Sequence, residues 1–327
     1  MGSSMSSSSS ISSKKKGTLK QNGIKKPVVP TPSHTSSDHS SQLSSERVMK
    51  QGRQFHNESN SAYWYPNDDQ ELDRLVGEHF ALKTLFNGNI PEGLFEKFSI
   101  PVEDNAKILD LGCGPGTWIM DVATELPNSE LVGVDISDVF PSDIRPSNVS
   151  FKLNNILDGI AFPDNTFDIV HFRFFCIALR SEEWIPVLKE IMRVLKPGGI
   201  IVSKEPGMLL EGNEFFKWAG KVFIDKMLER GQEPFAYDKI NQYLSEAGFE
   251  IVHHEHKPID FSKQDSVSKE FLWDMKGIFK SGQPYLAESL GVPNERYDAF
   301  LDRLVIEFQK PPACFWPISS TVGRKPL

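Results

Sequence analysis

Short apolar runs alternate with amphipathic patterns over residues 106–205, and this alternation constrains the fold more than any other feature of the chain. Strand-like runs are predicted at residues 106–112, 130–135, 148–154, 167–175 and 199–205. Helical patterns at residues 117–126 and 181–195 separate the first two runs and the last two. Strands that alternate with helices are joined by right-handed crossovers, which place them parallel in one sheet. The sequence therefore predicts an α/β fold.

The chain beyond residue 205 continues with both kinds of pattern. Further elements are predicted as helices at residues 213–228, 236–248, 269–279 and 294–309, and as strands at residues 249–261 and 313–323. No internal repeat is found in the sequence. These patterns predict two further strands after residue 205.

Residues 1–60 differ in composition from the rest of the chain. They contain 17 serines, nine Lys or Arg and three Asp or Glu, and they lack a periodic apolar pattern. Such a segment cannot bury enough surface to offset its ordering entropy, so it is predicted to be a disordered basic tail that can meet protein partners. The net charge of the whole chain is −8, so residues 61–327 carry −14. An acidic body is a poor candidate for direct binding of nucleic acid or an anionic membrane.

Two short features of this tail have competing interpretations. The first six residues, MGSSMS, fit the pattern for N-myristoylation at Gly2, and Lys14 to Lys16 fit either a second membrane signal or a nuclear-import signal. The simpler interpretation is a plain serine-rich tail in which both features occur by chance. We expect no membrane span, because no apolar run approaches about 18 residues.

The cysteines and histidines indicate the compartment and argue against a metal site. The chain has three cysteines, Cys113, Cys176 and Cys314, which are far apart and form no CxxC pair. This pattern is typical of a protein in a reducing compartment, and it argues against a disulfide framework and against a zinc cluster. The run His253 to His256 offers only two ligands on each face of a strand, so no metal is expected. The predicted location is cytoplasmic, with a nuclear location also open.

A helix is predicted before the first strand, from Asp69 to Phe86. Asp68 and Glu71 have the spacing of a capping box. Apolar residues at helical spacing then predict a stripe that packs on the following domain: Leu72, Leu75, Val76, His79, Phe80 and Phe86. The aromatic run Tyr63 to Tyr65 precedes the cap. This segment is predicted either to cover the sheet only or to close over a ligand site.

The stretch ILDLGCGPGTW, from Ile108 to Trp118, joins the first strand to the first helix through three glycines. Such turns let a ligand touch the backbone and expose the N–H groups of the helix. A dinucleotide fingerprint would need a glycine at position 117, where Thr117 stands, and no Lys-Ser/Thr pair follows for a P-loop. The loop therefore suits neither nucleotide class.

The same stretch resembles the first motif of the class I S-adenosylmethionine-dependent methyltransferases. The resemblance continues in VGVD at 132–135, NNIL at 154–157, FPDNTFDIVHFR at 162–173 and VLKPGGIIV at 194–202. It implies a Rossmann-like, doubly wound, mostly parallel seven-stranded sheet whose last strand is antiparallel. It also implies a methyltransferase domain over residues 61–327. The parts of that domain are a cap helix (61–90), a core (100–205), a helical acceptor insert (206–248) and C-terminal strands and helices (249–327).

The resemblance also implies where S-adenosylmethionine binds. Gly112 and Gly114 would let adenosine and the amino-acid tail approach the backbone, and Asp135 would accept hydrogen bonds from both ribose hydroxyls. Asn155 stands where the family commonly has Asp, and its amide oxygen can still accept from the adenine amine. The expected cofactor-binding residues are Asp110, Gly112, Cys113, Gly114, Gly116, Asp135, Ile136, Asn155, Ile156 and Arg173.

Several of these residues keep a second interpretation. Asp110 is expected to orient the cofactor's ammonium directly or through water, and capping of the turns they occupy is the second interpretation for Asp110 and Asp135. Ile156 is expected to pack on the adenine ring. Arg173 suits the carboxylate of an acceptor, the methionine carboxylate of the cofactor, or a structural salt bridge.

Methyl transfer from a sulfonium is a direct displacement, so the protein mainly aligns donor and acceptor and needs no nucleophile of its own. The catalytic residues are unknown from the sequence. His171, Arg173 and Glu205 are the candidates, and a packed structural role for His171 competes with a role as a base.

The segment YPNDDQELDRL and the C-terminal GRKPL resemble a fungal subgroup of LaeA-like regulators and trans-aconitate-methyltransferase-like enzymes. The predicted activity is methyl transfer to a small-molecule or protein acceptor. The alternative is a methyltransferase-fold regulator of fungal secondary metabolism or development that acts mainly through partners.

Overall fold

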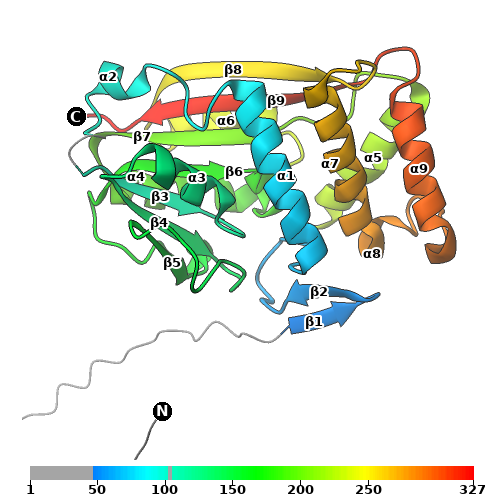
Figure 1. Ribbon diagram of the computed structural model, residues 1–327, viewed down its shortest axis with the longest axis horizontal. Helices are drawn as coiled ribbons and strands as arrows, with labels where there is room; N and C mark the ends of the chain where they lie inside the picture. The colour runs from blue at the N-terminus through cyan, green and yellow to red at the C-terminus, as the bar shows by residue number, and fades with distance from the viewer. Residues whose placement is uncertain (1–46, 102–104) are drawn as a thin grey trace, which may run out of the picture. The chain divides into compact units, whose positions relative to one another are not determined.

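A computed structural model describes residues 47–101 and 105–327, and its centre is a seven-stranded sheet (Figure 1). The strand order is β5-β4-β3-β6-β7-β9-β8, and β9 runs antiparallel to both of its neighbours. The other neighbouring strands pair parallel. The strands are β3 (Lys107–Leu111), β4 (Glu130–Asp135), β5 (Val149–Leu153), β6 (Phe167–Arg173), β7 (Leu195–Pro206), β8 (Glu250–Asp260) and β9 (Phe315–Arg324). The predicted mostly parallel sheet with an antiparallel last strand is confirmed.

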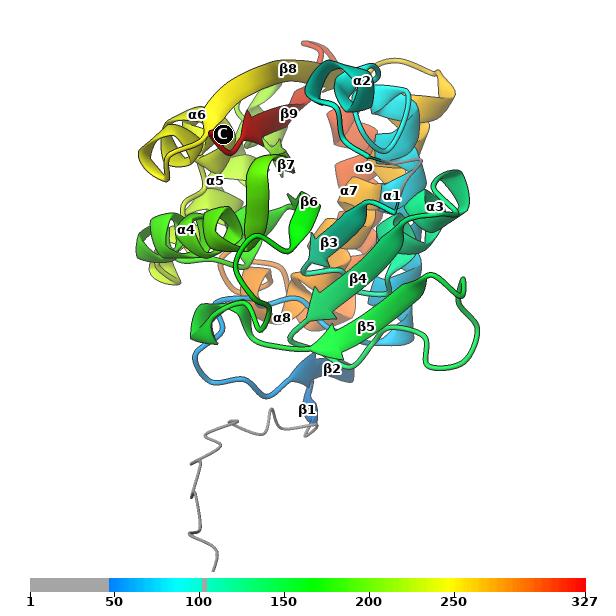
Figure 2. The same cartoon turned by 90° about the vertical axis from the view of Figure 1, so that its left-hand side faces the viewer.

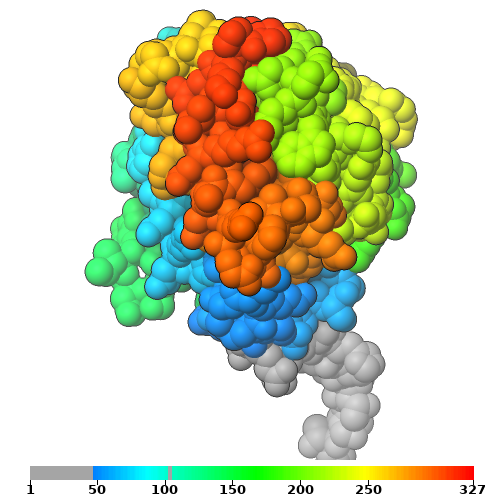
Figure 3. Space-filling model, turned by 90° about the vertical axis from the view of Figure 1, so that its right-hand side faces the viewer, coloured from blue at the N-terminus to red at the C-terminus, as the bar shows by residue number. Residues whose placement is uncertain are grey.

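Helices cover both faces of this sheet, as the view along it shows (Figure 2). One face carries α1 (Asp69–Phe86), α3 (Thr117–Glu125) and α7 (Ser266–Ser281), and the opposite face carries α4 (Trp184–Val194) and α6 (Ala236–Glu246). The remaining helices are α2 (Leu94–Phe98), α5 (Glu214–Glu229), α8 (Gln283–Leu286) and α9 (Tyr297–Phe308). Helices α5, α8 and α9 lie side by side on one outer face (Figure 3).

The inner strands β3, β4 and β6 are buried along most of their length because both faces of the sheet are covered there. Ile108 and Leu109 are adjacent in β3 and point to opposite faces, yet both are fully buried. Each belongs to a different apolar cluster, one on either side of the sheet. This two-sided burial explains why the strands read as continuous apolar runs in the sequence.

Order in the chain begins earlier than the sequence analysis predicted. Residues Arg47–Lys50 (β1) and Arg53–His56 (β2) form an antiparallel hairpin. Its two-residue turn, Gln51 and Gly52, has positive φ at both positions, as tight hairpins require. The prediction of disorder up to residue 60 is therefore wrong for residues 47–60. Residues 1–46, with Gly2 and the lysine run, lie outside the described residues.

This hairpin is attached to the body of the domain. Phe55 is buried and meets the ring of Tyr285 edge-on, with 6.0 Å between centroids. Two nitrogens of Arg53 donate to the carboxylate of Asp68 at 2.6 and 2.8 Å. Asp68 is also the N-cap of α1, so the same carboxylate fixes the hairpin and the start of the helix.

Truncation tests this boundary. We expect removal of residues 1–46 to leave the free energy of unfolding unchanged, because this segment lacks a core-forming pattern. Removal of residues 1–60 should lower it by at least about 1.5 kcal/mol, the lower end for burying a side chain such as Phe55. Urea unfolding of both chains beside the full protein measures the difference. Equal stability of all three would show that the hairpin contributes nothing to the fold.

The predicted helix from Asp69 to Phe86 is confirmed, but the predicted apolar stripe matches its buried face only in part. His79 and Phe86 are buried, and Leu72 and Leu75 are half-buried. Val76 and Phe80 are 37% and 51% exposed, whereas Arg74 and Glu78 are 4% and 1% exposed. The side chain of Asp68 caps the helix as expected, but the carboxylate of Glu71 binds Arg74 instead of closing a capping box. Hydrophobic periodicity did not predict this part of the buried face, because its charged side chains form a buried ion cluster with Asp274 of α7.

Candidate functional site

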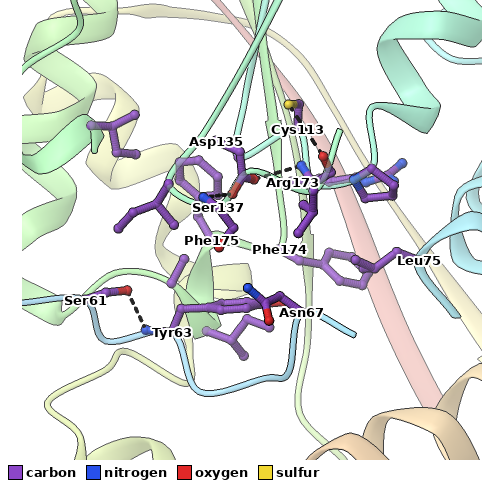
Figure 4. Close-up of a pocket in the computed structure, with 18 of the residues that line it drawn as sticks. Ser61, Tyr63, Asn67, Leu75, Cys113, Asp135, Ser137, Arg173, Phe174 and Phe175 are labelled. Atoms are coloured by element: carbon purple, nitrogen blue, oxygen red, sulfur yellow. Dashed lines mark hydrogen bonds between the residues drawn. The ribbon is translucent and has the colours of Figure 1, made fainter. Parts of the chain in front are cut away.

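A cavity of about 160 Å³ lies beyond the carboxyl ends of β3, β4 and β6. Parallel α/β sheets place their ligands at this edge. The segment that carries Ser61, Tyr63 and Asn67 runs along one side of the cavity, opposite Asp135 and Arg173 (Figure 4). Of the residues predicted to bind the cofactor, eight line this cavity: Gly112, Cys113, Gly114, Asp135, Ile136, Asn155, Ile156 and Arg173. We name this cavity the first cavity.

The glycine turn presents bare backbone to the first cavity. Gly112 and Gly114 both have positive φ, at 62° and 52°. A Cβ atom on Gly112 would lie 2.8 Å from the ring of Phe175, so a side chain there would have to displace that ring. Gly116 also has positive φ, at 75°, but a Cβ atom there would meet Phe151, and Gly116 does not line the cavity. The first two glycines therefore face the ligand space, and the third shapes the turn into α3.

Asp135 ends β4 with its carboxylate at the cavity wall. One oxygen accepts from the backbone N–H of Gly114 and the other from that of Ser137, both at 2.8 Å. Burial raises the pKa of Asp135, while these backbone N–H groups act in the opposite direction. Each carboxylate oxygen has two lone pairs, so each can accept one more hydrogen bond from a ligand hydroxyl. Turn capping and ligand binding are therefore compatible at this residue.

Asn155 and Ile156 follow β5 and line the same cavity. The side-chain oxygen of Asn155 accepts from the backbone N–H of Leu157 at 3.1 Å, which caps the short 3-10 turn Ile156–Asp158. Its second lone pair is available to a donor in the cavity. The residue is 3% exposed, so its amide has little freedom to turn away.

Arg173, at the end of β6, lines the cavity without a carboxylate partner among the described residues. One of its terminal nitrogens lies 3.2 Å from Nδ1 of His79, whose Nε2 lies 3.0 Å from Asp121. Burial and the nearby Arg173 lower the pKa of His79 to about 4, so the ring is neutral and can accept from Arg173. A structural salt bridge at Arg173, one of the predicted alternatives, is therefore not formed within the described part of the chain.

Asp110 and His171 lie beneath the cavity and do not line it. Nδ1 of His171 is 2.7 Å from a carboxylate oxygen of Asp110, and both residues are nearly fully buried. The imidazole stacks on Trp118 with 3.7 Å between ring centroids. Burial lowers the pKa of His171 well below its usual value and raises that of Asp110 to about 8. This geometry favours the packed, structural interpretation of His171.

Glu205 does not line the first cavity either. Its two oxygens accept from the backbone N–H groups of Phe175 and Cys176, at 2.8 and 3.1 Å. These bonds hold the turn after β6, which starts at Phe174 in a left-handed conformation (φ 56°). A non-glycine residue in this region is strained and persists only where its surroundings hold it. Glu205 therefore fixes the position of Phe174, which lines the first cavity.

Glu205→Gln gives a test with a defined pH dependence. Burial raises the pKa of Glu205 to about 8 in the folded protein, so the proton that it holds contributes stability at low pH. This contribution is lost as the pH rises through about 8. We expect the variant to lose about 1–3 kcal/mol at pH 5.5, because one backbone N–H loses its acceptor. The loss should be smaller at pH 8.5. Urea unfolding at both pH values measures this loss. If the free energies of unfolding of the two proteins changed with pH in parallel, the raised pKa of Glu205 would be contradicted.

A second cavity, of about 50 Å³, adjoins the first. Arg74, Glu78, Phe174 and Ile177 line both cavities. The three aromatic residues before α1 have different places. Tyr63 lines the first cavity and Tyr65 lines the second. Trp64 is buried in the core, and its indole N–H donates to Gln232. Sequence analysis missed Arg74 and Glu78. Their signal was the spacing of Glu71, Arg74 and Glu78, which places opposite charges on one helix face.

No helix in residues 47–101 or 105–327 has the length and apolar character needed to cross a membrane. The same residues contain no group of three His, Cys, Asp or Glu side chains suited to a metal ion. Within the predicted histidine run, Nδ1 of His254 lies 2.8 Å from the hydroxyl of Thr321, and His253 lies 3.4 Å from Glu255.

Comparison with known proteins gives matches to methyltransferases. Residues 108–199 match a family described as "Methyltransferase domain". The chain is 31% identical over 260 residues to the N-methyltransferase verN of Clonostachys rogersoniana, covering 76% of this chain and 88% of that protein. It is 25% identical over 279 residues to the secondary metabolism regulator laeA of Coprinopsis cinerea, covering 79% and 68%. A solved phosphoethanolamine N-methyltransferase 2 of Haemonchus contortus, in complex with S-adenosyl-L-methionine, is 19% identical with a TM-score of 0.46, covering 84% and 62%.

Proposed function

Because this chain belongs to the class I S-adenosylmethionine-dependent methyltransferases, in the LaeA-like group, we propose that its first cavity holds the cofactor through residues at the ends of β3, β4 and β6. When bound, S-adenosylmethionine supplies an electrophilic methyl group on its sulfonium. Asp135 carries the proposal, because its carboxylate lies at the cavity wall with lone pairs left for two ribose hydroxyls. Gly112 and Gly114 offer backbone that a ligand can approach closely.

We assign the adenine end to Asn155 and Ile156 and the methionine end to Arg173. Cys113 and Ile136 complete the cavity wall beside the glycine turn. Arg173 suits the carboxylate of the cofactor because it lines the cavity and no carboxylate of the described chain engages it. Asp110 lies 3% exposed under the turn, so we assign it to positioning the turn through His171 rather than to direct contact with the ammonium.

The residues of the chain align the reactants and exclude water, since a direct displacement needs no protein nucleophile. Tyr63 and the segment around it border the first cavity, in keeping with a strap over the site. We propose a nitrogen atom as the methyl acceptor. The support for this choice is the 31% identity, over 88% of its length, to a protein named as an N-methyltransferase.

The second candidate is a regulatory role, favoured by the similarity to a secondary metabolism regulator over 79% of this chain. In this case the same cofactor site would serve a protein that acts through partners, which its N-terminal tail would meet. That tail lies largely outside the described residues. Three unpaired, buried cysteines agree with the expected cytoplasmic or nuclear location for either function.

A labelling experiment separates these functions. The purified protein is incubated with S-adenosylmethionine labelled on its methyl carbon and with either the small-molecule or the protein fraction of a fungal extract. Label on a nitrogen atom of a small molecule would support the enzyme proposal, provided that Asp135→Ala reduces it strongly. Label on a nitrogen atom of a protein would support the enzyme proposal with a protein as the acceptor. Cofactor binding without label in either fraction would contradict the proposal of a nitrogen acceptor and favour the regulatory role.

A further inference from the structure

The second cavity is apolar on most of its wall. It lies between α5, α7, the end of β7 and β9, and it is lined by Met208, Leu209, Phe223, Met275, Phe279 and Trp316, among others. Arg74 and Glu78 are the charged residues of its lining, and both also line the first cavity. Its volume of about 50 Å³ admits roughly four water-sized groups, the size of a small aliphatic molecule or the end of a larger one.

We propose that the second cavity receives the methyl acceptor, that the acceptor is an apolar molecule with a basic nitrogen, and that Glu78 binds this nitrogen where the two cavities meet. This inference rests on the proposed function, because it places the cofactor in the first cavity. It adds the chemical class of the acceptor and the residue that selects it.

The position of the cavity supports the first part of the proposal. Displacement requires the acceptor atom about 3–3.5 Å from the methyl carbon, so the acceptor must occupy space continuous with the cofactor site. Phe174 and Ile177 border both spaces, as do the two charged residues. Phe174 is fixed by its left-handed backbone and by the hydrogen bond from its N–H to the carbonyl of Lys204 at 2.9 Å. The fold therefore positions Phe174, where the two cavities meet, before a ligand enters.

The charges at this boundary support a basic acceptor. Arg74 donates to Glu78 at 2.7 Å, to Asp274 of α7 at 2.6 Å and to Glu71 at 2.7 and 2.9 Å, and all four side chains are almost fully buried. One guanidinium thus faces three carboxyl groups. Burial raises the pKa of Asp274 to about 8, so this group is largely neutral at pH 7, but a negative excess remains.

A negative excess in an apolar pocket attracts a cation and repels an anion. Arg74 is already engaged by three carboxyl groups, so it has little capacity left for an anionic acceptor. It donates to Oε2 of Glu78, and the same carboxylate lines both cavities. The aromatic rings of Phe174 and Trp316, 6.2 Å apart, add faces that suit an apolar or cationic ligand.

The proposed methyl transfer needs only the acceptor, S-adenosylmethionine and the carboxylate of Glu78. The bound ammonium first gives a proton to the carboxylate of Glu78, which frees the lone pair of the acceptor nitrogen. This lone pair forms the bond to the methyl carbon, and the electron pair of the carbon–sulfur bond returns to sulfur as S-adenosylhomocysteine leaves. Glu78 gives up its proton when the products have left and the site is open to solvent. No oxidant or further reactant is needed.

Three probes of matched shape test the proposal: 3-methylbutylamine, 3-methylbutanol and 3-methylbutanoate. Each is titrated into the full-length protein saturated with S-adenosylhomocysteine, and ligand NMR reports the Kd. We expect the amine to bind at least ten times more tightly than the carboxylate, with the alcohol in between. Glu78→Gln should abolish this preference and leave the affinity for S-adenosylhomocysteine within twofold. Equal binding of the three probes to the wild type would overturn the proposal.

Glu71→Gln is the matched control. It removes the same charge from the same cluster, but Glu71 lines neither cavity, so the amine preference should persist. Equal loss of preference in both variants would assign the effect to the cluster as a whole and overturn the role of Glu78. Loss of cofactor affinity in Glu78→Gln, with the amine preference intact, would place this residue at the cofactor instead and would also overturn it.

A second variant guards against misfolding of Glu78→Gln. Met275→Phe places a larger side chain in the second cavity alone, so it should weaken amine binding at least fivefold and leave the cofactor affinity unchanged. Unchanged amine binding would locate the acceptor elsewhere. The proposed cofactor site is tested separately, because failure of the wild type to bind S-adenosylhomocysteine would refute that site before any probe is added.

Discussion

Asp135→Ala is expected to weaken the binding of S-adenosylmethionine by about 1.5–3 kcal/mol, the scale for hydrogen bonds to a charged group. This corresponds to a rise in Kd of roughly 10- to 150-fold. The reason is geometric, since the carboxylate ends β4 at the wall of the first cavity and can accept from both ribose hydroxyls. Calorimetry with S-adenosylmethionine and with S-adenosylhomocysteine should show similar losses, because both ligands carry the same ribose.

The variant also removes the acceptor of the Gly114 and Ser137 N–H groups, so a looser turn could mimic a lost ligand contact. Asp138→Ala is the matched control, because it removes the same charge from an exposed position outside the first cavity. Its affinity should stay within about twofold of the wild type. Asp135→Asn separates the two effects further, since the amide keeps one acceptor oxygen for the turn and loses the charge. Wild-type affinity in Asp135→Ala would refute the ribose assignment.

The sheet could be predicted from the sequence because its signals are local. Two-sided burial makes the inner parallel strands β3, β4 and β6 apolar runs, which local sequence alone reveals. Asp68 likewise predicted the start of α1 correctly, although Glu71 does not close the expected capping box. The hairpin of residues 47–56 was missed because its turn uses Gln51 in a left-handed conformation, where Asn, Asp or Gly is the usual signal.

The site was predictable only where residues follow a strand directly. Gly112, Asp135 and Arg173 meet at one edge because parallel strands end there together. His171 shares a face of β6 with Arg173 but lies two residues deeper in the strand, where it binds Asp110 beneath the first cavity. Glu205 accepts from the Phe175 turn and lines neither cavity. The acceptor side could not be predicted, since Arg74 and Asp274 are 200 residues apart in the chain. Only the packing of α1 on α7 brings them together.

The largest loss of stability is expected from Arg74→Met. The variant leaves Glu71, Glu78 and Asp274 buried without their shared cation, and breaking a buried ion pair from one side costs about 3–5 kcal/mol. Methionine has a similar length and fills the space, so the loss reports charge rather than a cavity. Urea unfolding at pH 7 measures it. Lys221→Met, in the exposed pair with Asp225, is the matched control and should change stability by no more than about 0.5 kcal/mol.

The pH dependence of this loss identifies its cause. Burial already raises the pKa of Glu71, and that of Asp274 to about 8, and removal of the guanidinium should raise both further. Groups whose pKa is raised in the folded state contribute stability at low pH and lose it as the pH rises. The destabilisation by Arg74→Met should therefore be smallest near pH 5 and grow towards pH 8, whereas that of Lys221→Met should stay flat. A penalty independent of pH would show that Arg74 stabilises the domain by packing rather than by its charge.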